Sequence, residues 1–248
     1  MDRIGQVAVN TMRLLTDSQK ITSSNLANLN TTGFRKDILM NINSTYLRDN
    51  NSLEDRVVAS RGDPGVDTTT SNLVNTDQPL DIAVDGPGFI VGTTPTGEKV
   101  MTRRGDMKIA TDGKLRNGDG LVIQGGGADI NIPPYEKISI GHDGTISYKP
   151  LGSEGNTMVP LSRIDLVSTP ASNVVRGLDS FLRSKTGQFP TIDATVKVAS
   201  NTLENSNVNS VDSLVELIQN QRSYETQIKL ISTAKELDTE TAKLMRSS

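Results

Sequence analysis

The apolar residues of this chain recur with a helical period only near its two ends. Between Ile4 and Leu29 they are spaced by three, four and seven residues, as one face of a helix requires. Thr, Ser and Asn side chains interrupt this face. Because an isolated helix gains most of its stability by packing its apolar side, a stripe this polar predicts a helix that needs a partner.

The second helical stripe begins after Leu203. Asn209 or Ser210 is suited to cap a helix, and Asp212 in its first turn is favoured by the helix dipole. A helix over residues 210–246 would be roughly 55 Å long, more than a globular domain usually needs. Helices of this length usually belong to a coiled coil or a bundle. The stripe comprises Leu214, Leu217, Ile218, Tyr224, Ile228 and Ile231, and continues through Ala234, Leu237, Thr241 and Leu244.

The middle of the chain has a different period. Gly33 stops the first helical pattern, and residues 37–78, dominated by Asn, Ser, Thr, Asp and Gly, predict an extended linker. From Pro79 onward apolar residues alternate with others, and Asp-Gly or Asn-Gly pairs follow at short intervals, as tight hairpin turns require. Residues 79–200 therefore predict a β-rich module.

We therefore predict an α+β protein with long N- and C-terminal helices and a mainly β middle domain. Its segments are an N-terminal helix and signature in 1–36, the linker in 37–78, the β-rich domain in 79–200 and a C-terminal helix in 201–248. The two helices are natural partners, but their interrupted stripes leave apolar surface uncovered after pairing. Because another copy or a relative is the obvious cover, the pattern indicates an assembling subunit.

The composition argues against several classes of partner. Lys and Arg total 26 against 29 Asp and Glu, a formal net charge of -3, so there is no excess positive charge to bind nucleic acid or an anionic membrane. No apolar run approaches the roughly 20 residues that cross a bilayer. The first residues lack the pattern of a secretory signal. We expect no nucleic-acid partner, no direct membrane insertion and, if the protein leaves the cytoplasm, export by another route.

The candidates for catalysis or metal binding are weak. The single histidine, His142, lies in a turn, and the absence of Cys removes thiolate metal sites and cysteine nucleophiles. Asp112, Asn117 and Asp119 offer oxygen ligands but lack the spacing of a calcium loop. We expect no catalytic residue, metal or cofactor. A β-rich carbohydrate-binding or hydrolytic module is the alternative from another class, and it leaves both terminal helices unexplained.

Several segments of the chain resemble one known family, the flagellar rod, hook and hook-associated axial proteins. They occur in family order and extend over nearly the whole chain. The longest match is Ser24-Asn25-Leu26-Ala27-Asn28-Leu29-Asn30-Thr31-Thr32-Gly33-Phe34-Arg35-Lys36. The others are residues 79–89, 102–105 with 112–115, 143–147, and 203–209 leading into a helix that carries 221–225.

The resemblance implies a non-enzymatic subunit of the flagellar basal-body rod. In such a subunit the terminal helices form a coiled-coil-like inner layer of a tube that spans the periplasm, and the β-rich domain lies outside. Partners would be other rod subunits, of the same or different kind, and the flagellar type III export apparatus, with no cleaved signal peptide. Length and the Met1-Asp2-Arg3 start are most similar to proximal rod members; the distal rod, or another axial protein, is the alternative.

The resemblance also names candidate residues for the assembly interface. At helical spacing, the amides of Asn25 and Asn28 could bind backbone groups of a neighbouring chain and fix its register. The alternative for this pair is solvated or capping Asn near a helix end. The full candidate set is Asn25, Leu26, Asn28, Gly33, Phe34, Leu214, Leu217, Ile218, Tyr224, Ile228 and Ile231.

Overall fold

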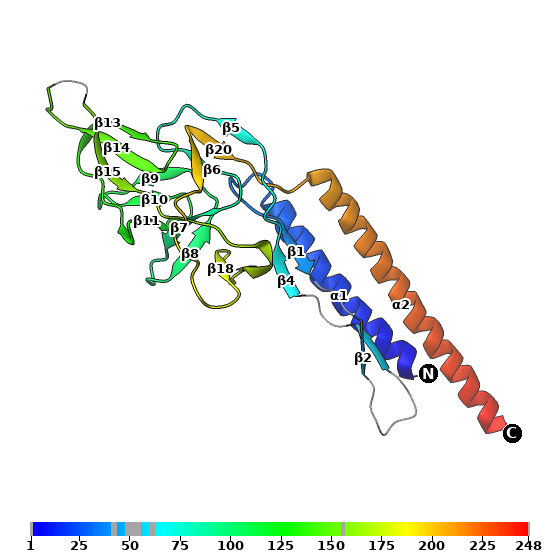
Figure 1. The fold of residues 1–248 in the computed structure, drawn as a ribbon. Helices are drawn as coiled ribbons and strands as arrows, with labels where there is room; N and C mark the ends of the chain where they lie inside the picture. Colours follow the sequence, from blue (N-terminus) through cyan, green and yellow to red (C-terminus); the bar gives the residue numbers. More distant parts are fainter. Residues whose placement is uncertain (1, 41–43, 48–55, 60–62, 155–156, 248) are drawn as a thin grey trace. The chain divides into compact units, whose positions relative to one another are not determined.

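The computed structural model describes residues 2–40, 44–47, 56–59, 63–154 and 157–247 (Figure 1). The chain forms two compact units. The helical unit consists of Met1–Ala27, Asp37–Pro64 and Asn209–Ser248, and the β-rich unit consists of Asn28–Lys36 and Gly65–Val208. The loop that follows the first helix thus belongs to the β-rich unit.

The helical unit is built on two helices, one from each end of the sequence. Helix α1 spans Asp2–Ala27 and helix α2 spans Ser210–Ser247. Of the two residues suited to cap α2, Asn209 does so, because its side-chain oxygen accepts a hydrogen bond of 2.9 Å from the backbone N–H of Val211. Its short strands are β1 (Asp37–Met40), β2 (Ser44–Leu47) and β3 (Arg56–Ala59), and β2 pairs with β3. β1 pairs with β4 (Asp63–Val66), whose last two residues belong to the β-rich unit.

The prediction of a coiled-coil-like helix pair is wrong. The two helices do contact each other, and Asn220 donates a hydrogen bond of 2.9 Å to the hydroxyl of Ser18. However, large apolar side chains of the predicted stripe, such as Leu214 and Ile218, are about half exposed, at 47% and 52%. A coiled coil requires such residues to insert as knobs between four residues of the facing helix.

The physical reason lies in which side chains the helical unit buries. Among the described side chains of α1 and α2, the buried ones are small or polar: Ala8, Thr22, Asn25 and Ser213. Small side chains offer little apolar area and cannot serve as knobs. The overall α+β composition fits the prediction, with one helix at each end of the sequence and a large β-rich middle.

The β-rich unit contains one large sheet and several smaller ones. The large sheet has the order β17-β18-β8-β7-β11-β10-β9, with β12 added to β11 and β16 added to β7. Figure 1 labels β7 to β11 and β18 of this sheet. Its strands are β7 (Phe89–Thr93), β8 (Lys99–Thr102), β9 (Met107–Ile109), β10 (Leu115–Asn117), β11 (Val122–Gly125), β12 (Ala128–Asp129), β16 (Leu166–Val167), β17 (Val174–Arg176) and β18 (Leu182–Ser184).

The smaller sheets are a three-stranded meander and two pairs. The meander contains β13 (Tyr135–Ile140), β14 (Thr145–Pro150) and β15 (Val159–Arg163). The pairs are β6 (Ile82–Asp85) with β19 (Lys197–Ser200), and β5 (Leu73–Asn75) with β20 (Thr202–Glu204). A short 3-10 helix, η1 (Ala171–Asn173), precedes β17. The expected Gly residues with positive φ occur at the hairpin turns, for example at Gly113 and Gly144, but not at Gly118.

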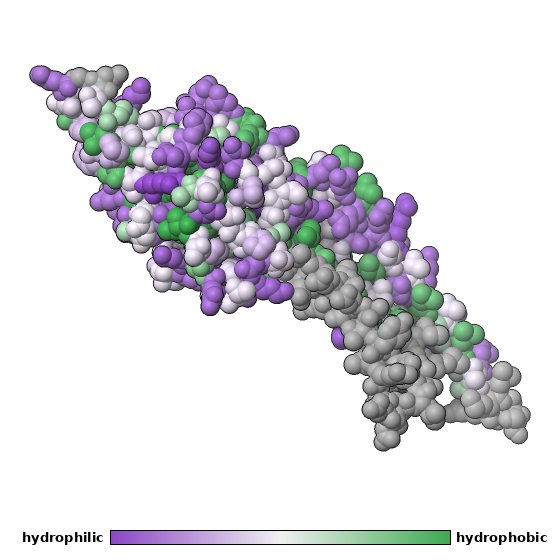
Figure 2. Space-filling view, viewed as in Figure 1, coloured by the Kyte–Doolittle hydropathy of each residue, from purple (hydrophilic) through white to green (hydrophobic). Residues whose placement is uncertain are grey.

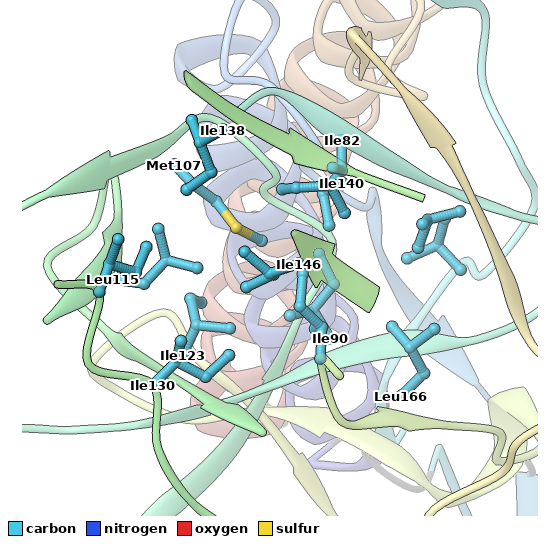
Figure 3. Packing of buried hydrophobic residues seen from close by; sticks show 14 of the residues in the cluster. Ile82, Ile90, Met107, Leu115, Ile123, Ile130, Ile138, Ile140, Ile146 and Leu166 are labelled. Atoms are coloured by element: carbon cyan, nitrogen blue, oxygen red, sulfur yellow. The ribbon is translucent and has the colours of Figure 1, made fainter. Parts of the chain in front are cut away.

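Strand β7 is buried on both faces, which explains its continuous apolar run. Successive side chains of a strand point to opposite faces. Accordingly, Ile90 packs into a large aliphatic cluster, while Phe89 and Val91 pack into a second cluster. Figure 3 shows part of the large cluster, in which β9, β11, β13 and β14 contribute Met107, Ile123, Ile138 and Ile146. These two clusters hold the β-rich unit together without a buried Trp or Tyr.

Candidate functional site

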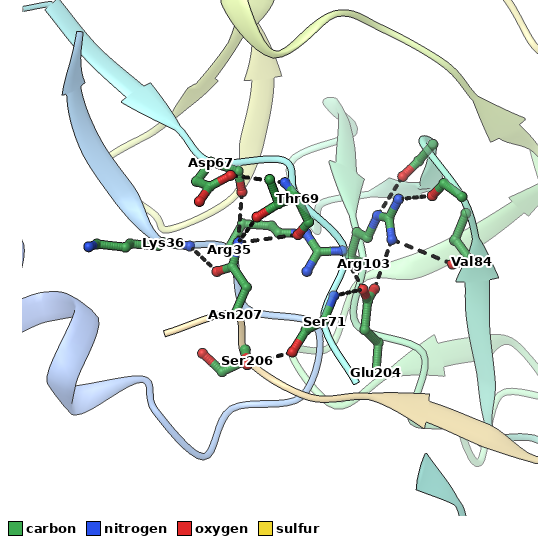
Figure 4. A network of polar contacts seen from close by, with 12 residues as sticks. Arg35, Lys36, Asp67, Thr69, Ser71, Val84, Arg103, Glu204, Ser206 and Asn207 are labelled. Carbon is green, nitrogen blue, oxygen red and sulfur yellow. Dashed lines mark hydrogen bonds and ion pairs between the residues drawn. The ribbon is translucent and has the colours of Figure 1, made fainter. Parts of the chain in front are cut away.

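Three segments far apart in the sequence meet at the carboxylate of Glu204, inside the β-rich unit (Figure 4). Arg35 Nη2 donates to Glu204 Oε1 at 2.6 Å, and Arg103 Nη1 donates to Oε2 at 2.8 Å. The three side chains are at most 1% exposed. We call Arg35, Arg103 and Glu204 the Glu204 network.

Arg103 also holds the turn between β6 and β7. Its Nε donates to the carbonyl of Gly88 at 2.7 Å, and its Nη2 donates to the carbonyl of Gly86. Its guanidinium lies 5.6 Å from the centroid of the Phe89 ring, where the cation is attracted by the ring face. Arg103 therefore links the Glu204 carboxylate to the backbone of a turn in the sequence motif at residues 79–89.

Backbone groups complete the surroundings of Glu204. The N–H of Ser71 donates to Glu204 Oε1 at 2.9 Å, and the N–H of Gly33 donates to the Glu204 carbonyl at 2.7 Å. The hydroxyl of Ser71 donates to the carbonyl of Ser206 at 2.9 Å. The carboxylate and the backbone of Glu204 thus hold the segments before β5 and after α1 against β20.

The charges of the Glu204 network do not cancel. Burial acts to raise the pKa of Glu204, but the hydrogen bond from Arg35 and the charge of Arg103 outweigh it, so the pKa lies below its ordinary value. Burial, together with the nearby charge of Arg35, lowers the pKa of Arg103. Two guanidinium groups thus face one carboxylate. Among the described residues, Nε and Nη1 of Arg35 are buried without a hydrogen-bond partner.

Gly33 is required at its position by close packing. Its φ is +67°, and a Cβ there would lie 2.3 Å from the carbonyl oxygen of Arg103. Next to it, Phe34 is buried and the guanidinium of Arg176 lies 4.4 Å from the centroid of its ring. Arg176 Nη2 also donates to the carbonyl of Arg35 at 2.6 Å. Gly33 and Phe34, two of the residues predicted for the assembly interface, are therefore packed inside the β-rich unit.

Asn207 joins three segments near the points where the chain passes between the two units. Its Oδ1 accepts a hydrogen bond from the N–H of Lys36 at 2.6 Å, and its Nδ2 donates to the carbonyls of Asp67 and Thr69 at 3.0 and 3.3 Å. The N–H of Asp67 donates to the carbonyl of Lys36 at 2.8 Å. One amide side chain thus fixes the relative register of the segments around residues 36, 67 and 207.

Asn25 connects two segments of the helical unit through its side-chain amide, as Asn207 connects segments of the β-rich unit. Its Nδ2 donates to the carbonyl of Asp37 at 2.9 Å, and its Oδ1 accepts from the N–H of Asp37 at 2.8 Å. Asn25 is 1% exposed, so the predicted bond to a neighbouring chain would require this pair to open. Asn28 Oδ1 accepts from the hydroxyl of Thr31 at 3.2 Å, and Leu26 is half-buried.

The candidate residues on α2 lie at the surface of the helical unit. Leu214, Ile218 and Ile228 are about half exposed, whereas Leu217, Tyr224 and Ile231 are partly covered. Figure 2 shows apolar residues separated by polar ones along this helix. Tyr224 also borders a groove of about 640 Å³ whose other walls come from α1, including Val9, Met12 and Leu14.

Sequence reasoning did not find the roles of Arg35, Arg103, Glu204 and Asn207. Each was part of a motif. Charged residues are rarely fully buried, so the pattern gives no reason to place Arg35, Arg103 and Glu204 together, and nothing in it distinguishes Asn207 from the other polar residues of its motif. The only available signal was opposite charge within separate motifs of otherwise polar residues. Within the part of the chain that the structure describes, we find no cluster of metal-ligating side chains and no helix with the length and apolarity to cross a bilayer.

The two units together define a class of protein. The helical unit leaves large apolar side chains uncovered, and the buried charges of the β-rich unit are used to hold chain segments together. This arrangement is typical of a structural subunit that is completed by neighbours.

Comparison with known families supports this class. Residues 6–35 match the flagella basal body rod protein family, residues 83–148 match the D1 domain of flagellar hook protein FlgE/F/G, and residues 199–244 match the C-terminal region of flagellar basal body rod FlgEFG proteins.

Individual relatives match over almost the whole chain. Flagellar basal-body rod protein FlgF of Salmonella typhimurium is 32% identical over 242 residues, covering 95% of both chains. The FlgF protein of Escherichia coli is 33% identical with 94% of both chains covered, and the FlgG protein of Bacillus subtilis is 30% identical with 91% of this chain and 92% of the relative covered. The chain belongs to the flagellar basal-body rod protein family, which is structural and not enzymatic.

Proposed function

We propose that this protein is a structural subunit of the proximal part of the flagellar basal-body rod and that it polymerises through its terminal helices. The observation that carries the proposal is the match to FlgF proteins over about 95% of the chain, with rod-family matches at both terminal segments. Its role is to help build the drive shaft, and its location is the basal body.

The exposed apolar residues of the helical unit supply the proposed interface. Transfer of apolar surface from water to a protein contact stabilises it by roughly 25 cal/mol per Å². Among the side chains of α2 that the structure describes, seven large apolar ones are between 47% and 65% exposed, namely Val211, Leu214, Val215, Ile218, Ile228, Leu230 and Leu237. Each would contribute modestly, so the contact becomes stable only when many are covered together, as happens in a polymer.

The proposed partners are other rod subunits, both copies of this chain and its relatives. Neighbours would cover the exposed side of α2 and enter the groove beside Tyr224. The candidate residues Leu26, Leu217 and Ile231, which are partly covered already, would be buried further. We also expect delivery by the flagellar type III export apparatus without cleavage of a signal peptide.

Complementation of a strain that lacks the gene tests this function. The strain is expected to build no complete rod and to be non-motile, and the wild-type chain is expected to restore both. Ile218→Asp combined with Ile228→Asp places charge on the proposed interface and is expected to fail. Gln219→Asp is the matched control, because Gln219 is an exposed polar residue of the same helix, and it is expected to restore motility. Complete rods in the deletion strain would contradict the proposal.

A distal rod subunit, or another axial protein of the hook family, is the second candidate. The observation that favours it is the 30% identity to FlgG of Bacillus subtilis over most of both chains. Electron cryotomography of the deletion strain separates the two. Loss of a proximal subunit is expected to leave no rod beyond the export apparatus, whereas loss of a distal subunit is expected to leave a short rod.

A further inference from the structure

Arg35 adds a positive charge to a buried ion pair that is already neutral without it. Arg103 and Glu204 balance each other, and Arg103 has further acceptors in the carbonyls of Gly86 and Gly88. Arg35 makes a single side-chain hydrogen bond, to Glu204, and its Nε and Nη1 are without partners among the residues described. Buried donors without partners and uncompensated buried charge are both unfavourable.

The Arg35 side chain is therefore poorly explained by the stability of the β-rich unit alone. An apolar residue of similar length would remove the excess charge and the two unpaired donors, and would leave Glu204 paired with Arg103 and with the N–H of Ser71. Removal of one partner from a buried ion pair is costly when it leaves the other charge unpaired. Without Arg35 the carboxylate of Glu204 keeps Arg103 as its partner, so this cost does not arise. Some other property of Arg35 must account for its position.

That property is the pair of chain segments that Arg35 connects. Helix α1 ends at Ala27, eight residues before Arg35 (35 − 27), and α2 begins at Ser210, six residues after Glu204 (210 − 204). The Arg35–Glu204 ion pair thus joins the segment that follows one terminal helix to the segment that precedes the other. The backbone bonds from Gly33 to Glu204 and from Asn207 to Phe34 lie beside it.

We infer that Arg35 is a positioning residue, whose ion pair with Glu204 fixes the register between the segments leading to the two terminal helices. The β-rich unit does not need Arg35 to fold. The inference rests on the proposed function, since a fixed register matters only if the terminal helices must enter an assembly together. Because folding of the β-rich unit does not depend on Arg35, the effect of a substitution at Arg35 on stability can be measured separately from its effect on register.

The stability arm compares purified full-length variants by thermal unfolding. The thermal midpoint of Arg35→Met is expected to lie no more than about 3 °C below that of the wild type, or above it. A difference of this size corresponds to little change in stability. Arg183→Met is the matched control, because Arg183 forms its ion pairs with Glu98 and Asp179 at the surface. An Arg35→Met midpoint lowered by about 10 °C or more would show that Arg35 is simply structural and would overturn the inference.

The register arm uses amide hydrogen exchange of the same proteins. The N–H groups of Gly33 and Lys36 bind the Glu204 carbonyl and Asn207 Oδ1. Their exchange is expected to be at least about tenfold faster in Arg35→Met through local opening, with the core strands unchanged. Arg35→Lys keeps the charge, but a flexible ammonium fixes the direction of its bond to Glu204 less well than a planar guanidinium, so its exchange is expected to be intermediate. Unchanged exchange in Arg35→Met would overturn the inference, whatever the function of the protein.

The assembly arm introduces the variants into the deletion strain. Arg35→Met is expected to yield at least about tenfold fewer complete rods than the wild type, at equal protein level, and Arg183→Met is expected to match the wild type. Full rod assembly by Arg35→Met would contradict a positioning role. A deletion strain that still builds rods would instead refute the proposed function, and the exchange measurement would still decide the role of Arg35.

Discussion

Substitution of Glu204 by Gln removes the one negative charge that the buried guanidinium groups of Arg35 and Arg103 share. The change replaces one carboxylate oxygen by an amide group and keeps the volume. Glu204 accepts hydrogen bonds from Arg35, Arg103 and the N–H of Ser71. An amide retains one acceptor oxygen, so at least one of the arginines faces an NH₂ group that can only donate.

The expected loss of stability is about 3 to 5 kcal/mol, the usual cost of removing one partner from a buried ion pair. The value belongs at the upper end because two buried guanidinium groups lose their counter-ion. For a unit of this size, 1 kcal/mol shifts the midpoint of thermal unfolding by about 2 to 4 °C. A decrease of about 10 °C or more is therefore expected for Glu204→Gln.

The assay is thermal and urea unfolding of the purified chain, monitored by the far-ultraviolet circular dichroism signal of β-structure. Glu98→Gln is the matched control, because Glu98 is an exposed carboxylate that pairs with Arg183. Surface ion pairs contribute little, so its midpoint is expected to stay within about 2 °C of the wild type. A Glu204→Gln midpoint as close to the wild type as that of Glu98→Gln would refute the account of the Glu204 network.

Four further predictions concern pH and packing. The folded-state pKa of Glu204 lies below its unfolded value of about 4.3, so its stabilisation is fully present above that pH and is lost as pH falls through the lower folded-state pKa. The gap between the urea midpoints of wild type and Glu204→Gln should therefore begin to narrow below about pH 4.3 and close only as pH falls past the folded-state pKa. Gly33→Ala should lower the free energy of unfolding in urea by about 2 to 5 kcal/mol, because its Cβ would meet the backbone of Arg103. Gly97→Ala is the control, since its Cβ would meet open space, and it should lose only about 1 to 2 kcal/mol through the strain of a positive φ. Equal losses would contradict the packing argument. Asn207→Ala should lose about 1 to 3 kcal/mol, because the N–H of Lys36 loses its acceptor, and the exposed Asn205→Ala serves as control. Ile146→Ala, at 0% exposure in the aliphatic cluster, should lose about 2 to 5 kcal/mol by the same assay, and Val159→Ala, at 41% exposure, should lose under about 1 kcal/mol.

The local structure of the chain was predictable because it depends on neighbouring residues. The helical period at both ends corresponds to α1 and α2, and Asn209, one of the two predicted capping residues, caps α2. Positive φ at Gly113 and Gly144 likewise agrees with the Asp-Gly pairs to which these glycines belong.

The way the helices pack was not predictable from the same stripe. Large apolar residues at helical spacing indicate a face that needs cover, but they do not say whether the covering chain is present. In this chain the two helices bury small or polar side chains, such as Ala8 and Ser213, and leave Ile218 and Ile228 about half exposed. The stripe therefore described a surface of the helical unit and not its core.

The Glu204 network joins residues that are far apart in the sequence, and a local sequence pattern does not predict such contacts. Arg35 and Glu204 are 169 residues apart, and neither stands in an apolar stripe. Their burial becomes understandable only once Gly33, Arg103 and the turn after β6 are seen to enclose them. The sequence motifs at residues 24–36, 102–105 and 203–209 showed which segments matter, and the structure shows that they contact one another.

Site-specific photo-crosslinking in intact basal bodies tests the central claim most directly. A photoreactive residue is placed at Ile228, or at exposed Glu225 on the same helix as a comparison, and crosslinked chains are identified by mass spectrometry of purified basal bodies. We expect the chain to be present in the purified basal bodies and the Ile228 probe to crosslink to copies of this chain or to other rod subunits. A chain that is absent from basal bodies, or an Ile228 probe that reacts with no rod subunit, would contradict the account.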